Sequence, residues 1–204
     1  IITDYRPTAT ATAISCGVDS FTTLKEYTID CPLEDYKITH LTFFENGAHH
    51  LNKIGYDERQ ERVFEGQLAH VRKFCDMYGY ELIYIASNLN QVLSELFWND
   101  GFVFTHTYRN IGFTLLLQKL IKTYYYSAAF DLDSFRCSLD DDPAFYEKFL
   151  LPCLSTEHTT FYSSNKSMSR LEKTKYISNF EQTYDNLLVC YMSDKNCGKC
   201  SKCI

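Results

Sequence analysis

The chain has 204 residues, of which 45% are hydrophobic and 23% charged, which is enough for one sizeable core and atypical of a disordered tail. Its net charge of −6, with no run of five or more Lys or Arg, disfavours a nucleic-acid partner and favours a small-molecule substrate. No apolar stretch approaches the roughly 20 residues that span a bilayer, so the sequence predicts no membrane segment.

Predicted strands and helices alternate along the chain. The strand segments share β-branched, aromatic or small apolar residues. They are residues 8–14, 37–44, 80–86, 124–130 and 161–163. The helical segments have apolar residues at spacings of three and four. They are residues 20–27, 57–78, 110–121 and 169–180, with a short helix starting at Asp142-Pro143. Gly79 is expected to end the second helix, and Ser169 with Glu172 has the capping-box form before the last. This alternation predicts an α/β fold with a parallel sheet covered by helices on both faces, in one domain spanning residues 1–204.

The segment Ser15-Cys16-Gly17-Val18-Asp19-Ser20 joins the first strand to the first helix, where a phosphate-binding loop is expected. Gly17 lets an anion approach the backbone, the two serines offer hydroxyls, and the N–H groups of the helix start point toward the ligand. Asp19 would repel a phosphate by itself, so its presence predicts a bound Mg²⁺. The alternative is a strand-to-helix turn in which these residues only cap the helix.

Four of the nine cysteines crowd into the last 15 residues with the spacing C-x6-C-x2-C-x2-C. They are Cys190, Cys197, Cys200 and Cys203, and four thiolates so spaced predict a closed, structural Zn²⁺ site within residues 187–204. A redox C-x-x-C pair is the competing interpretation, which the overlapping spacings disfavour. The other cysteines are scattered, which favours a cytoplasmic protein over a secreted disulfide scaffold. We expect the native chain to continue past Ile204 and to have been trimmed at its N-terminus.

Three basic residues are candidates for binding an anion. Arg109 is expected between a loop and a buried helix, where it would face a nucleotide or a substrate acid; the alternative is a solvated or capping arginine. Arg170 and Lys173 lie in the first turn of the last predicted helix, where the helix dipole disfavours cations, so we expect them to serve a phosphate. Lys166 on the preceding loop competes with Lys173 for this role.

Two further clusters are weaker candidates. The pair His49-His50 follows the second predicted strand, but adjacent histidines rarely bind one ion, so any role would be in a substrate loop. The run Asp140-Asp141-Asp142 is better explained as a solvated loop that caps the helix at Pro143 than as a cation site.

The segment from Ser15 to Ser20 resembles the S-G-G-x-D-S motif of the PP-loop ATP pyrophosphatases, with Cys16 in place of a glycine. Within that class, the tail from Asn196 to Cys203 (NCGKCSKC) is similar to that of the 7-cyano-7-deazaguanine synthases, and Arg109-Asn110 corresponds to their Arg-Asn pair. The likeness covers nearly the whole chain in motif order. It implies a Rossmann-like, adenine nucleotide alpha hydrolase-like fold and the cofactors ATP, Mg²⁺ and Zn²⁺.

The resemblance also implies a reaction. ATP would adenylate a small carboxylate with release of AMP and pyrophosphate, and a nitrogen nucleophile such as ammonia would then displace AMP, as in a C–N ligase. Asp19, Arg109 and Lys173 are the implied catalytic residues, and the loop with Arg170 would bind the nucleotide. Cys16 is interpreted as a tolerated variant, although a thiol at a helix N-terminus can be an activated nucleophile.

Two departures leave the substrate open: Tyr108 stands where these synthases have a small residue, and their deazapurine-recognising residues have no evident counterpart. Two alternatives therefore remain. One is a tRNA-thiolating enzyme of another PP-loop lineage, which the charge of −6 disfavours. The other is a non-catalytic nucleotide-binding partner in a larger assembly. The sequence allows a homodimer without requiring one.

Overall fold

The structure is a computed structural model that describes residues 6–48, 58–96, 101–138, 142–190 and 192–204. Within these residues, parallel strands form a five-stranded sheet with the order β3-β2-β1-β4-β5. The strands are β1 (Ala9–Ala13), β2 (His40–Phe44), β3 (Glu81–Ile85), β4 (Ile121–Ser127) and β5 (Thr160–Ser164). This is the order of the first five strands of the Rossmann arrangement, whose ligand crevice lies at the carboxyl ends of the strands near the central strand.

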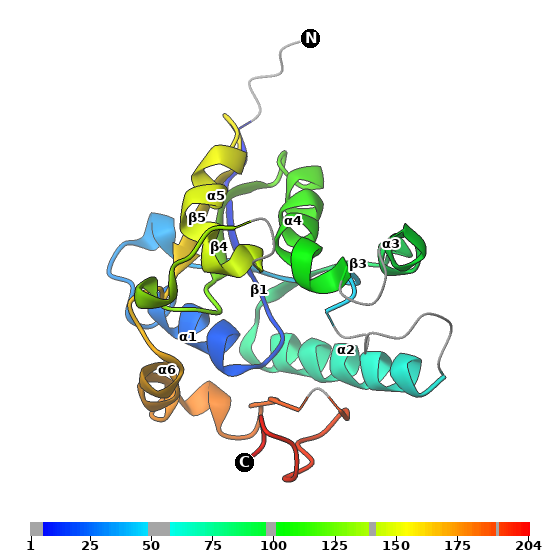
Figure 1. Ribbon diagram of the computed structural model, residues 1–204. Coiled ribbons are helices and arrows are strands. Elements are labelled where there is room, and N and C mark those ends of the chain that lie inside the picture. Colours follow the sequence, from blue (N-terminus) through cyan, green and yellow to red (C-terminus); the bar gives the residue numbers. More distant parts are fainter. Residues whose placement is uncertain (1–5, 49–57, 97–100, 139–141, 191) are drawn as a thin grey trace.

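Helices cover both faces of the sheet (Figure 1). The helices on one face are α1 (Val18–Glu26), α2 (Glu58–Tyr78) and α6 (Arg170–Ile177), and those on the other are α4 (Gly101–Leu116) and α5 (Glu147–Leu154), with α3 (Leu89–Leu96) beside α4. Short 3-10 helices are η1 (Glu34–Tyr36), η2 (Leu132–Ser134), η3 (Pro143–Phe145) and η4 (Glu181–Thr183). The predicted Rossmann-like α/β fold is confirmed.

A separate hydrophobic cluster lies on each face of the sheet. On the first, Phe21 of α1 packs edge-on against Phe74 of α2, with ring centroids 5.4 Å apart. On the second, Tyr124 of β4 and Phe161 of β5 pack beneath the helices. The central strand β1 is buried almost throughout and is built from Ala and Thr, because a parallel strand covered on both sides has no solvent-facing row.

Several predicted element boundaries are correct, and others are wrong. Gly79 follows α2 with a φ of 73°, a left-handed conformation that glycine adopts freely, and the predicted capping box of Ser169 is present at α6. The helix predicted at 110–121 instead spans Gly101–Leu116, and the strand predicted at 124–130 spans Ile121–Ser127. Helix α3 was not predicted at all.

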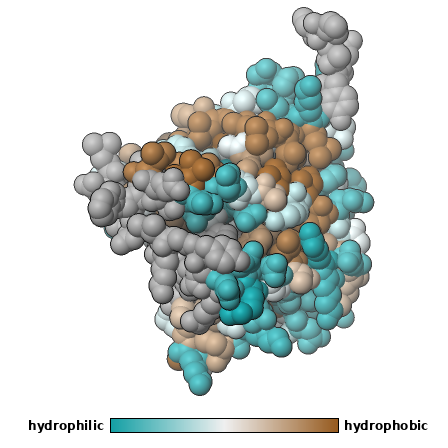
Figure 2. Space-filling model, turned by 90° about the vertical axis from the view of Figure 1, so that its right-hand side faces the viewer, coloured by the Kyte–Doolittle hydropathy of each residue, from teal (hydrophilic) through white to brown (hydrophobic). Residues whose placement is uncertain are grey.

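The helix predicted at 110–121 was expected to be buried, and within that range this is wrong at Leu116, on the outer surface of α4. Phe104, Tyr108 and Leu116 are spaced by four or eight residues along it and are all exposed, Leu116 by 75%. Figure 2 shows apolar surface on the side of the molecule where α3 and α4 lie. Among the described helices, none combines the length and apolar character needed to cross a membrane.

Candidate nucleotide and metal sites

The predicted phosphate loop lies at the carboxyl end of β1, immediately before α1. Gly17 is the N-cap of α1 and has no side chain that could cap the helix, and none of the described side chains accepts from the N–H groups of Val18, Asp19 or Ser20 in the first turn. The hydroxyl of Ser15 accepts a hydrogen bond from the Gly17 N–H (3.3 Å), and that of Ser20 donates to the Gly17 carbonyl (3.0 Å). A Cβ at Gly17 would stand 3.2 Å from the Ser15 Oγ, so a larger residue would crowd the loop.

Cys16 lies in the left-handed region, with a φ of 56°, which explains why a glycine suits this position of the motif. Its side chain is fully buried, and its carbonyl accepts a hydrogen bond from the Leu188 N–H at 2.8 Å. Burial raises the pKa of the Cys16 thiol far above its usual range. A neutral, inaccessible thiol is a poor nucleophile, which supports the interpretation of Cys16 as a tolerated variant.

Asp19, in the first turn of α1, is held by two cations from α6. Arg170 Nη1 lies 2.5 Å from one carboxylate oxygen and Lys173 Nζ lies 3.1 Å from the other. Lys173 also donates to the Ala128 carbonyl just beyond β4 (2.5 Å), and its side chain is only 1% exposed. The structure therefore brings together three of the predicted site residues from segments about 150 positions apart. Lys166, the competing lysine, is exposed.

Helix α1 is itself anchored to the neighbouring strands. The Thr23 hydroxyl lies 2.8 Å from that of Ser127, at the end of β4, and 2.7 Å from that of Ser164, at the end of β5. Buried hydrogen bonds of this kind fix the helix relative to the carboxyl edge of the sheet. The phosphate loop and Asp19 thus sit on a rigid frame.

A cavity of about 640 Å³ opens beside the loop, within the size range of small-molecule sites. The phosphate loop forms one wall with Ser15, Gly17 and Asp19, and the end of β2 forms another with Phe44 and Asn46. Further lining residues come from α2, α4, α6 and the C-terminal segment: Gln67, Phe102, Asn110, Arg170, Leu188, Val189, Cys190 and Lys202. The C-terminal contribution was not predicted, because nothing in the sequence relates residues 188–202 to the first loop.

Arg109 does not lie before a helix as predicted, since it is inside α4. Its side chain is buried and donates from Nη1 to the Asn46 carbonyl and to Asn90 Oδ1, both at 2.8 Å. Gly47, with a φ of 99°, permits this approach, because a Cβ there would lie 2.7 Å from Nη1. Arg109 thus supports the wall that includes Asn46, and its predicted catalytic role remains untested.

The two weaker clusters lie largely outside the described residues. His49-His50 and Asp140-Asp141 belong to segments that the structure does not describe. Asp142 caps η3, as predicted, because its side chain accepts a hydrogen bond from the Ala144 N–H. Its Oδ1 atom also lies 2.7 Å from Nε2 of His106, within hydrogen-bonding distance.

The four predicted metal ligands come together at the C-terminal end. The Sγ atoms of Cys190, Cys197, Cys200 and Cys203 all lie within 4.8 Å of one another, and Sγ of Cys203 is 3.9 Å from that of Cys197 and 3.4 Å from that of Cys200. Four sulfurs bound tetrahedrally at the usual Zn–S length of about 2.3 Å would stand about 3.8 Å apart. The spacing therefore fits a single zinc ion, whereas an iron–sulfur cluster must fit several irons and sulfides among its thiolates.

Backbone N–H groups at this site also favour the thiolate form of one cysteine. The N–H groups of Lys199 and Cys200 hydrogen-bond to Cys197 and lower the pKa of its thiol to about 6. A thiolate already favoured at neutral pH is the ligand form that zinc requires. We refer to Cys190, Cys197, Cys200 and Cys203 as the four-cysteine site.

No protein-family model matches the chain, and no curated protein matches it either. Among solved structures, the chain is similar to the U34-tRNA thiolase NcsA from Methanococcus maripaludis with its [4Fe-4S] cluster, at 15% sequence identity and a TM-score of 0.47. The match covers 84% of this chain and 57% of the thiolase chain, so it spans little more than half of that protein.

Proposed function

We propose that this chain binds ATP at the phosphate loop and cleaves it between the α- and β-phosphates, as a PP-loop ATP pyrophosphatase. The observation that carries the proposal is the uncapped start of α1, which opens into the cavity beside Asp19, Arg170 and Lys173. Free N–H groups at a helix start bind phosphate, and two nearby cations would stabilise a departing pyrophosphate. A kinase-like P-loop would instead need a lysine shortly after the loop glycines, and α1 has none in that register.

Magnesium fits the donors that the loop offers. Each oxygen of Asp19 accepts from one cation and keeps a second lone pair, and Ser15 supplies a hydroxyl that lines the cavity. Bound there, Mg²⁺ would supply charge neutralisation for the leaving pyrophosphate. The chain's own residues orient the nucleotide: the loop N–H groups hold the phosphates, and Arg170 and Lys173 hold Asp19 in place.

The finer proposal is that the acceptor is a small carboxylate and that ammonia then displaces AMP, giving C–N ligation. The part of the cavity away from the loop combines the rings of Phe44 and Phe102 with the amides of Asn46 and Asn110. Flat rings and amides suit a heteroaromatic acid better than an aliphatic one. Which acid is the substrate is determined by the assay with a panel of acids.

The test is the fate of ATP labelled on the α-phosphate, incubated with Mg²⁺, ammonium and a panel of heteroaromatic acids. We expect acid-dependent AMP and pyrophosphate, and at least a hundredfold loss of rate in Asp19→Asn, since charge placement of this kind contributes 10²–10³-fold. Asp76→Asn, on the exposed side of α2, is the matched control and should keep full activity. Acid-dependent ADP and phosphate would contradict the proposal, and tight ATP binding without turnover would favour the non-catalytic alternative.

A tRNA-thiolating enzyme remains the second candidate, because the four-cysteine site adjoins the cavity and Cys190 is part of the cavity wall. Sulfur chemistry would place cysteines or a cluster at that position. This candidate predicts that AMP release depends on tRNA rather than on a small acid, and that the purified protein contains iron. The same labelled-ATP assay with added tRNA, together with elemental analysis, separates the two.

A further inference from the structure

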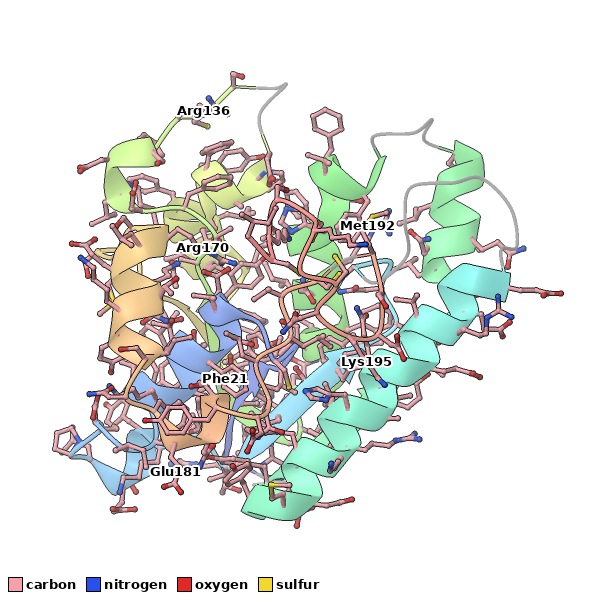
Figure 3. All side chains as sticks on the ribbon, turned by 90° about the horizontal axis from the view of Figure 1, so that it is seen from below. Phe21, Arg136, Arg170, Glu181, Met192 and Lys195 are labelled. Atoms are coloured by element: carbon pink, nitrogen blue, oxygen red, sulfur yellow. The ribbon has the colours of Figure 1, made fainter. Side chains whose placement is uncertain are left out.

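The C-terminal end of the chain reaches the phosphate loop through residues 187–190, which we call the strap. The Leu188 N–H donates to the Cys16 carbonyl at 2.8 Å, and the Leu188 carbonyl lies 3.9 Å from the position that a Cβ of Gly17 would take. The last three residues of the strap also line the cavity. In Figure 3 the segment that follows the strap, with Met192 labelled, lies between α2 and α6. The strap is therefore the part of the C-terminal segment that can act directly on the loop.

The amide of Asn196 binds the strap on both sides of Leu188. Its Oδ1 accepts from the Val189 N–H (2.9 Å) and the Cys190 N–H (3.3 Å). Its Nδ2 donates to the Leu187 carbonyl at 2.7 Å. Asn196 itself is exposed, so water could satisfy its amide, whereas Leu188 and Cys190 are buried. The three hydrogen bonds therefore serve the backbone of the strap.

These bonds continue into the phosphate loop through two peptide units. A trans peptide unit is planar, and its C=O and N–H groups point in opposite directions. The Leu187 carbonyl, which accepts from Asn196, shares a peptide unit with the Leu188 N–H. That N–H donates to the Cys16 carbonyl, which shares a peptide unit with the Gly17 N–H. An unbroken chain of hydrogen bonds thus runs from the Asn196 amide to the Cys16–Gly17 peptide of the loop.

This chain of hydrogen bonds prepares the Gly17 N–H for an anion. Its bond to the Ser15 hydroxyl is long, at 3.3 Å, so a phosphate oxygen can replace that acceptor. Hydrogen bonds in series polarise one another, so the donors behind the Cys16 carbonyl make the Gly17 N–H a stronger donor. The same bonds hold Cys16 at a φ of 56°, which a residue other than glycine keeps only where its surroundings fix it. The orientation of this N–H is therefore set before a ligand binds.

We propose that Asn196 is a positioning residue of the nucleotide site, which acts through the strap to aim the Gly17 N–H at a phosphate. This inference rests on the proposed ATP binding. Asn196 is not among the described residues that line the cavity, so its effect on the ligand is indirect. Its loss should weaken binding because a loop that must be ordered when the ligand binds lowers the affinity.

The test compares the wild type with two variants by titration calorimetry, with ATP and inorganic pyrophosphate as the ligands. Asn196→Ala should weaken the binding of both about tenfold, as expected for the loss of one hydrogen bond to a charged group. Ser201→Ala is the matched control, because Ser201 lies in the same C-terminal segment, is exposed and uncharged, and does not line the cavity. It should keep the wild-type affinity, and both variants should contain as much metal as the wild type.

Hydrogen exchange of the Leu188 amide, followed by NMR, tests the route through the strap. In Asn196→Ala this exchange should be about tenfold faster than in the wild type, because the strap opens more readily. Coupling between two sites is reciprocal, so pyrophosphate bound at the loop should slow the same exchange in the wild type. The second measurement needs no variant.

The outcomes separate the two proposals. A wild-type protein that binds neither ATP nor pyrophosphate rejects the proposed function, and the role of Asn196 is rejected with it. If the wild type binds both ligands, an equal affinity in Asn196→Ala overturns only that role. Leu188 exchange that responds neither to Asn196→Ala nor to pyrophosphate would also overturn it. Loss of metal in Asn196→Ala, or an equal loss of affinity in Ser201→Ala, would overturn it in favour of a structural role for the whole segment.

Discussion

Glu147, at the start of α5, should make the stability of this protein fall as the pH rises through neutrality. Its side chain is 3% exposed; Oε1 accepts from the Ser163 hydroxyl at 2.6 Å, and Oε2 has no hydrogen-bond partner among the described residues. Burial raises the pKa of this carboxyl from 4.5 to about 7, although the Ser163 hydrogen bond and the charge of Lys173 oppose the rise. The folded protein therefore prefers the protonated form.

The size of the effect follows from these two pKa values. Between pH 4.5 and about 7 the folded state binds a proton that the unfolded state has released, so unfolding becomes easier as the pH rises. At about 1.4 kcal/mol for each pH unit, the ionised form costs roughly 3 kcal/mol once the pH exceeds 7. Below pH 4.5 both states are protonated and the cost vanishes.

The substitution Glu147→Gln removes this titration while keeping the shape and the acceptor for Ser163. In urea unfolding at pH 8 the variant should be more stable than the wild type by roughly 3 kcal/mol, and at pH 5 by only about 0.8 kcal/mol. Glu81→Gln, at the exposed first residue of β3, is the matched control and should differ from the wild type by less than about 0.5 kcal/mol at either pH. A difference for Glu147→Gln that is the same at pH 5 and pH 8 would refute the reasoning.

Two further predictions concern cysteines. Because Cys16 has a φ of 56°, Cys16→Gly should keep ATP turnover and change the free energy of unfolding by no more than about 1 kcal/mol, since relief of backbone strain offsets the lost thiol. The β-branched Cys16→Val should cost about 2 kcal/mol or more. Urea unfolding and the ATP assay check both variants, and a covalent adduct trapped on Cys16 would contradict the prediction. We expect elemental analysis to find one zinc ion per wild-type chain. Cys200→Ser should lose this ion and lower Tm, whereas Cys153→Ser, at an exposed cysteine outside the site, should change neither. A stable wild-type protein without metal would contradict this prediction.

Sequence patterns predicted correctly the features that depend only on residues close together in the chain. The strand-to-helix junction at residues 15–20, the glycine after α2 and the capping box at Ser169 each depend on a few neighbouring residues, and each is found where it was predicted. The four-cysteine site belongs with them, since three of its ligands lie within seven residues of one another. The parallel sheet followed from the alternation of strand and helix patterns.

The start of α4 shows where such signals fail. Residues 102–108 (FVFTHTY) consist of aromatic and β-branched residues with one histidine, a composition typical of a strand, yet they form the first half of a helix. Tertiary packing decides the outcome: Thr107 and Arg109 are buried, and Arg109 bonds to the loop after β2. The misplaced helix start is also why Arg109 was expected to face the nucleotide.

The C-terminal wall of the cavity shows a second limit and has a consequence for the metal. Leu188 and Lys202 lie at least 168 residues along the chain from the loop beside which they line the cavity, and only the fold brings them there. The free energy of metal binding at such a site is free energy of folding for the segment that carries the ligands. Residues 188–190 and Lys202 line the cavity and belong to that segment. A metal ion bound by the four cysteines would therefore also preorganise one wall of the ligand site, and a preorganised wall lowers the ordering cost of binding. Stability and ligand affinity are therefore expected to depend on the same four thiolates.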